Sequence, residues 1–202
     1  DLEVIGLFGV TLGPADTGRL RLSNVSVGGD DVLDTGVIPC GVQPGFNQWV
    51  HIPPAALTAQ YMRIDIDAPS RSGAGFFDAG RAWAGPVWMP EVNYAVGARE
   101  RWIDTSERVR APRSGAVFVD EGAVYRSLEI SFDWLSEADR LQALELDRVC
   151  GRRGQLLFIP DSDGDLARGP LLGSLPETMP ITEAMNAVPP VYSKPFTLEQ
   201  DL

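Results

Sequence analysis

The chain has 202 residues, 44% of them hydrophobic, and a formal net charge of -11 at pH 7. That apolar content is enough to form a core and argues against a disordered chain. The acidic balance argues against sequence recognition of nucleic acid or binding to an anionic membrane as the main role. No stretch approaches the length of a transmembrane helix, and no signal peptide is recognisable. Because the chain opens at Asp1 without an initiator methionine, we expect that an upstream portion is absent.

The first half of the chain has the pattern of short strands separated by turns, which favours a mainly β fold. The clearest alternation places Met62, Ile64 and Ile66 on an inward face. Pro86 is expected to end the last strand of this half, so we predict a β-sandwich domain over residues 1–88. The strand-like runs of this half are 2–10, 19–27, 37–38, 46–52, 61–67 and 76–88.

The second half, predicted as a domain over residues 89–202, contains one well-marked helix at about 136–150. Ser136 is a good N-cap with Asp139 three residues later, an approximate capping box, and Gly151 is a suitable C-terminal cap. The apolar face of this helix is expected to comprise Ala138, Leu141, Leu144 and Val149, with Leu146 at its edge.

Strands are predicted on both sides of the helix. Before it lie strand candidates at 91–102 and 115–120, and then an alternating run from Tyr125. That run places Leu128, Ile130, Phe132 and Trp134 on one parity.

After the helix, residues 155–159 form an apolar run of strand length. Residues 161–186 form a long irregular stretch, which is a functional loop, a short hairpin or a segment ordered by a neighbour. Residues 188–198 contain prolines and are predicted as an edge strand that closes the domain.

The sequence offers little catalytic chemistry and implies no cofactor. His51 is the one histidine, so a site built on several histidines is excluded, and no phosphate-binding or nucleophile motif is present. Asp161, Asp163 and Asp165 alternate as calcium ligands do, but the glycine and glutamate of a calcium loop are missing. An acidic turn is therefore favoured over a metal site, and we expect no enzyme activity.

Two further sets of side chains are candidate contact residues. One set is a local basic patch, which is either a self-paired solvated surface or an ion-pair belt between subunits. The other set is the tryptophans, of which two are candidates for glycan stacking although most tryptophans in a β-rich chain are core residues. The patch comprises Arg99, Arg101, Arg108, Arg110 and Arg113, and the glycan candidates are Trp49 and Trp83.

Several segments together resemble a family of tail proteins of tailed bacteriophages and prophages. Residues 59–66 (AQYMRIDI) and 77–83 (FDAGRAW) resemble strands of discoidin-like, or galactose-binding-like, β-sandwiches. The segments 125–128, 134–138, 157–161 and 194–198 resemble a second, tail-tube-like module with one flanking helix.

The resemblance implies a structural protein of the virion tail, of the distal tail or tail-tip type, which assembles in the bacterial cytoplasm. Its partners would be copies of itself in a ring and other tail proteins such as the tube, tape measure and hub. A carbohydrate-binding module for a host surface glycan and a glycan-cleaving tail enzyme are the alternatives.

Overall fold

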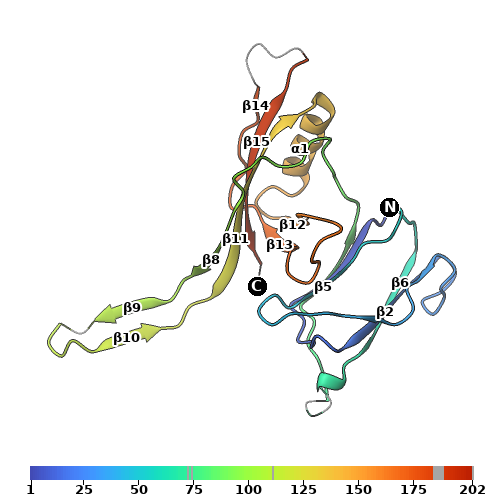
Figure 1. The fold of residues 1–202 in the computed structure, drawn as a ribbon, viewed down its shortest axis with the longest axis horizontal. Coiled ribbons are helices and arrows are strands. Elements are labelled where there is room, and N and C mark those ends of the chain that lie inside the picture. Colours follow the sequence, from blue (N-terminus) through green and yellow to red (C-terminus); the bar gives the residue numbers. More distant parts are fainter. Residues whose placement is uncertain (72, 74, 111, 184–188, 202) are drawn as a thin grey trace. The chain divides into compact units, whose positions relative to one another are not determined.

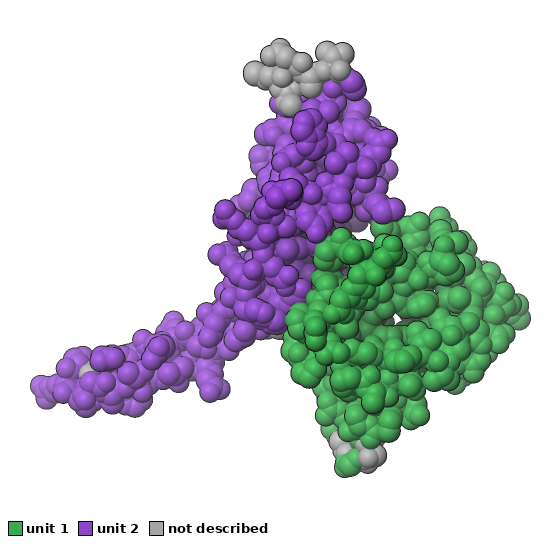
Figure 2. Space-filling model, viewed as in Figure 1, with its two compact units in different colours: residues 1–87, 159–170 green, residues 88–158, 171–202 purple. Residues whose placement is uncertain are grey.

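The computed structural model describes residues 1–71, 73, 75–110, 112–183 and 189–201. The fold is mainly β with one α-helix in the described part of the chain, which confirms the predicted fold class. The chain divides into two compact units (Figure 1; Figure 2). Unit 1 comprises residues 1–87 and 159–170, and unit 2 comprises residues 88–158 and 171–202.

Unit 1 contains two antiparallel sheets. The first has the order β5-β1-β7, and in the second β2 pairs with β6 along its whole length and with β3 and β4 at its two ends. The strands are β1 (Val4–Phe8), β2 (Thr17–Ser23), β3 (Leu33–Asp34), β4 (Ile38–Pro39), β5 (Gln48–His51), β6 (Tyr61–Asp67) and β7 (Arg81–Gly85), with a 3-10 turn η1 (Pro69–Arg71) after β6.

The core of unit 1 is built from side chains of both sheets. Ile5, Leu20 and Leu22 are fully buried in one cluster, and Ile64 and Ile66 of β6 pack against it as predicted. Met62 was expected to point inward but is exposed, because β6 is an edge strand whose first residues have neighbours on one side only.

A buried carboxylate fixes the loops of unit 1. Asp16 is fully buried and accepts hydrogen bonds from the backbone N–H of Gly13 at 2.7 Å and from the N–H and hydroxyl of Ser70 at 3.0 and 2.5 Å. Burial acts to raise the pKa of Asp16, but these hydrogen bonds and the nearby Arg71 guanidinium outweigh it and hold the pKa below its usual value.

Unit 1 also includes the segment 159–170, which the sequence assigned to the second domain. The side-chain amide of Gln48 donates to the Ala167 carbonyl at 3.3 Å, and Arg168 donates to the Gln43 side chain at 3.3 Å. The long stretch after β12 is therefore ordered in part by unit 1. The compact units divide the chain at residue 87 and again around this segment, whereas the predicted domains divide it once, at residue 88.

Unit 2 is built on a six-stranded antiparallel sheet with the order β12-β13-β15-β11-β8, in which β14 also pairs with β15. A separate two-stranded ribbon of β9 and β10 joins β8 to β11. The elements of unit 2 are β8 (Arg99–Asp104), β9 (Glu107–Arg110), β10 (Val117–Asp120), β11 (Val124–Leu135), α1 (Glu137–Val149), β12 (Gln155–Phe158), β13 (Leu171–Ser174), β14 (Thr182–Glu183) and β15 (Tyr192–Gln200).

The last strand lies inside the sheet, so its predicted edge position was wrong. β15 pairs with β11 on one side, and on the other side with β14 at Ser193 and with β13 at Glu199. Pro195 lies between these two pairings, where the second side of β15 is free of a ladder, and a residue without an N–H is tolerated there. Residues 184–188 of the predicted loop and strand lie outside the described residues.

A β-bulge changes the parity of β11 near its end. Leu128, Ile130 and Phe132 are buried as predicted, but Trp134 is exposed and Leu135 is buried in its place. The register between β11 and β15 shifts between Phe132 and Leu135. An extra residue at a bulge reverses which side chains face the core, so the prediction for Trp134 was wrong.

Helix α1 has the predicted caps but the opposite orientation. The Ser136 hydroxyl accepts from the Asp139 N–H at 3.2 Å, the Asp139 carboxylate accepts from the Ser136 N–H at 3.4 Å, and Gly151 follows with a positive φ of 48°. The buried residues are Asp139 and Ala143, whereas the expected core face points outward, with Leu141 at 54% and Leu144 at 42% exposure.

Prediction for unit 1: replacing Asp16 by Ala should lower the free energy of unfolding by about 3 kcal/mol, because it leaves buried N–H groups without acceptors. Since the folded pKa of Asp16 is depressed, its stabilisation is fully present above the pKa of the unfolded state, near 4, and is lost as pH falls toward the folded value. Urea unfolding between pH 3 and 7 measures both effects, and an unchanged pH dependence in the Asp16→Asn variant would contradict this account.

Candidate assembly interface

A ribbon arm, defined here as residues 105–122 with β9 and β10, projects from the sheet of unit 2 (Figure 1; Figure 2). Its two strands pair only with each other within the described chain, and every residue of both strands is exposed. A two-stranded ribbon is marginally stable in water without a surface to pack on. The arm therefore has the properties of an element that is completed by a partner.

The two faces of the arm differ in chemistry. Arg110 lies opposite Val117 and Arg108 opposite Val119, so one face combines two arginines with two valines. Because successive side chains alternate between faces, the other face has Val109 opposite Phe118, which is 62% exposed.

Like charges meet at the base of that second face, where Glu107 lies opposite Asp120. Carboxylates in directly opposed positions repel each other and weaken the ribbon. The arm therefore gains little stability from its own side chains.

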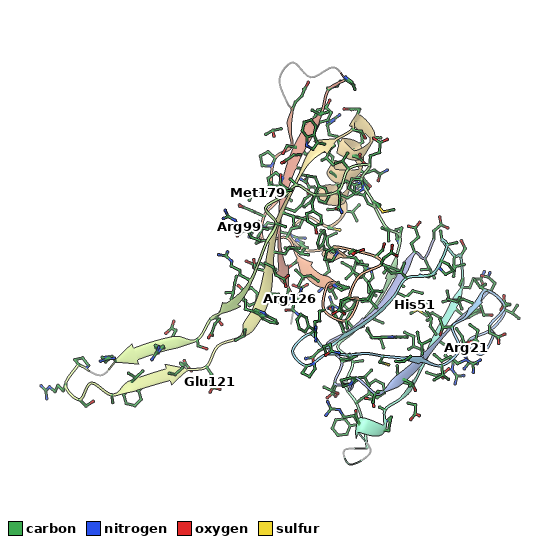
Figure 3. All side chains as sticks on the ribbon, viewed as in Figure 1. Arg21, His51, Arg99, Glu121, Arg126 and Met179 are labelled. Atoms are coloured by element: carbon green, nitrogen blue, oxygen red, sulfur yellow. The ribbon has the colours of Figure 1, made fainter. Side chains whose placement is uncertain are left out.

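The arm is attached firmly at its root. Arg126 of β11, only 3% exposed, donates through Nε to the Glu100 carboxylate of β8 at 2.8 Å, and its backbone N–H donates to the Gln200 side chain at 3.1 Å. In Figure 3, Arg126 lies where the arm joins the sheet and Glu121 lies on the arm itself. The ribbon is thus held by a buried guanidinium at one end and is exposed along its length.

A second exposed apolar surface is the outer face of α1, defined here as Ala138, Leu141, Leu144 and Val149. Val149 is 64% exposed, and the neighbouring acids Glu137 and Glu145 each pair with the arginine three residues later at 2.5 Å. Burial of a leucine side chain contributes roughly 2 kcal/mol, so a partner that covers this face would gain appreciable free energy.

Polar groups help to fix which face of α1 packs on the sheet, together with Leu146, which packs against the core. Asp139 accepts from the indole N–H of Trp88 and from the backbone N–H of Glu91, both at 3.4 Å. Lys194 of β15 is fully buried and donates to Asp147 at 2.6 Å and to the Met179 carbonyl at 2.9 Å. These contacts turn the outer face of α1 toward solvent.

The predicted arginines lie on the arm and its root. Arg101 pairs with Glu129 of its own chain at 3.2 Å, as the self-paired alternative expects. Arg99 lies on β8, Arg108 and Arg110 lie on β9, and Arg113 lies in the turn of the arm; none of these four forms an ion pair with another described residue. Their role in subunit contacts stays a prediction.

The other predicted residues do not gather into a site. Trp49 is 3% exposed and belongs to the core cluster of unit 1, so it has no open ring face for a glycan, and that suggestion was wrong. Trp83 on β7 is half-buried. His51 is half-buried as well, and desolvation lowers its pKa, which favours the neutral ring.

The acidic run after β12 forms local turns. Asp161 accepts from the Asp163 backbone N–H at 3.0 Å, and Asp165 accepts from the Ala167 N–H at 3.0 Å. Across the described ranges, no three His, Cys, Asp or Glu side chains are grouped as metal ligands. The helices of the same ranges are too short or too polar to cross a membrane.

A hollow of about 320 Å³ lies on the second sheet of unit 1 and is lined mainly by charged side chains. Arg19 pairs with Asp34 at 2.5 Å, and Asp65 pairs with Arg21 at 2.6 Å and Arg63 at 2.7 Å. Arg19, Arg21, Arg63 and Asp65 of the lining are thus each paired with a charge of opposite sign.

The predicted strand at 115–120 contains β10, but no strand was predicted at β9, and the exposed valines and phenylalanine of the arm were not identified as contact residues. The signal was present, because Val109 alternates with arginines and residues 117–119 follow a Pro-Arg-Ser-Gly turn. Because β9 was missed, the predicted strand at 115–120 was not recognised as one half of a longer ribbon.

Comparison with known proteins gives limited information. No family model matches the chain, and no curated protein matches it. Among solved structures, one similar chain belongs to the tail of an empty GTA particle with C6 symmetry, with 18% identity and a TM-score of 0.34. The match covers 55% of this chain and 78% of that chain. Likeness at this level carries no argument for function.

Prediction for the helix anchor: replacing Lys194 by Met should lower the free energy of unfolding by about 3 kcal/mol, because it leaves the half-buried carboxylate of Asp147 without its counter-ion. Adding Asp147→Leu should recover most of that loss. Urea denaturation of the two single variants and the double variant gives the cycle, and purely additive losses would contradict the account.

Proposed function

We propose that this protein is a non-enzymatic structural subunit of a phage-like tail, of the distal tail or tail-tip type, which acts by binding other subunits through unit 2. The observation that carries the proposal is the exposed ribbon arm, which is fixed at its root by Arg126 and is incomplete without a partner. A soluble protein seldom keeps such an element unless an assembly covers it.

The proposal also draws on the sequence resemblance of residues 125–128, 134–138, 157–161 and 194–198 to the tail-tube-like module of tail proteins. These segments include parts of β11, the start of α1, the end of β12 and β15, all in unit 2, while residues 159–161 belong to unit 1. Most of the residues that carry the resemblance therefore belong to the sheet from which the arm projects or to the helix beside it.

Under this proposal, copies of the subunit form a ring, and other tail proteins such as the tube, tape measure and hub bind to it. The sandwich of unit 1, proposed to be discoidin-like, contacts neighbouring tail proteins or a host surface glycan. The protein assembles in the host cytoplasm and resides in the virion.

Prediction for the proposed function: tail particles purified from producing cells should contain this protein in a fixed ratio to the other tail proteins. Mass spectrometry of gradient-purified particles measures the ratio, and electron microscopy with an antibody against unit 1 locates it. Finding the protein only as a free species, absent from particles, would overturn the proposal.

A further inference from the structure

We propose that the ribbon arm of one copy docks on the outer face of α1 of a second copy, so that subunits join head to tail. This inference rests on the proposed function and names the two surfaces that the assembly would use. The partner is a second copy of this chain, because both surfaces are exposed on each copy, their charges differ in sign, and a contact between two different surfaces can repeat from copy to copy.

Neither surface is covered within one protomer. Val117, Val119 and Phe118 on the arm are 42%, 54% and 62% exposed, and Leu141 and Val149 on α1 are 54% and 64% exposed. Each copy therefore presents apolar side chains on the arm and on α1 that the described part of its own chain leaves open. Contact between the arginine–valine face of one arm and the helix of the next copy would bury Val117 and Val119 together with the α1 face, while Phe118 lies on the opposite face of the arm.

Charge favours a copy of the same chain as the partner. Residues 108–119, the outer part of the arm, contain three arginines and no acid, which is +3 of a net charge of -11 and leaves -14 on the rest of the chain. Glu107, Asp120 and Glu121 lie at the base of the arm, so the positive charge is confined to its outer part. A basic, apolar tip is attracted to an acidic molecule, and complementary charge speeds and orients association.

The receiving face has matching chemistry at its edges. Leu141 and Leu144 are flanked by Glu137 and Glu145, which pair with Arg140 and Arg148 of their own helix but keep side chains that are 51% and 52% exposed, so an arm guanidinium would share these carboxylates. The face of the arm with Arg108 and Arg110 beside two valines offers apolar contacts to those leucines and guanidinium groups to those carboxylates.

The two surfaces are different, so the contact is heterologous. Contacts of this type repeat from copy to copy and close into a ring or continue as a filament, whereas a self-complementary surface stops at a dimer. The arm and the helix face thus provide the two ends that repeated assembly needs.

The test uses the full chain and two double variants. V117E/V119E disables the arm, and L141E/L144E disables the helix face; V25E/V27E is the matched control, because both valines are exposed in unit 1. Analytical ultracentrifugation measures association, and circular dichroism verifies that each variant is folded. The unmodified chain and the control should form oligomers larger than dimers, and each interface variant should bind at least about 30-fold more weakly.

An equimolar mixture of the two interface variants is the decisive sample. Each variant retains one intact surface, so the mixture should form one-to-one dimers and no larger species. A mixture that stays monomeric, or an arm variant that assembles like the unmodified chain, would overturn the docking. If the docking fails in this way but the unmodified chain still forms oligomers, the proposed structural role stands and only this interface is wrong. An unmodified chain that remains monomeric would also overturn the docking. Absence of the protein from purified particles is what overturns the structural role itself.

Discussion

The buried ammonium of Lys194 determines how unit 2 is put together. It joins β15, the helix through Asp147 and the carbonyl of Met179, and it lies 4.9 Å from the centre of the Phe196 ring. A buried charge requires a fixed set of partners, because desolvation is costly when any partner is missing. These partners fix the rotation of the helix on the sheet, and that rotation leaves Leu141 and Leu144 in solvent while Leu146 packs against the core.

This arrangement explains why much of the fold was predictable and the helix face was not. Strand positions, the Ser136 cap and the Gly151 C-terminal cap follow from local periodicity and capping chemistry. The orientation of α1 depends on contacts of Asp139 and Asp147 with residues about 50 positions away, such as Trp88 and Lys194. A helical pattern identifies an apolar stripe but does not show whether that stripe meets the core or a partner.

The same limit applies to the sheet. The bulge in β11 depends on pairing with β15. The alternation of residues 125–134 therefore cannot predict that Trp134 points outward. Proline is excluded from an interior strand only where that strand is hydrogen-bonded on both sides. The prolines near the end of the chain therefore led to the wrong prediction of an edge strand. For the candidate interface, sequence analysis located the arginines and missed the ribbon that displays them.

The chain passes between the two units three times, near residues 87, 158 and 170, because a loop of the strand pair β12–β13 belongs to unit 1. Cleavage of one peptide bond therefore cannot separate all residues of one unit from all residues of the other. Truncation after the first crossing would remove part of the packing of unit 1 and all of unit 2. Each unit is thus built from two segments of the chain that are separated in the sequence by residues of the other unit.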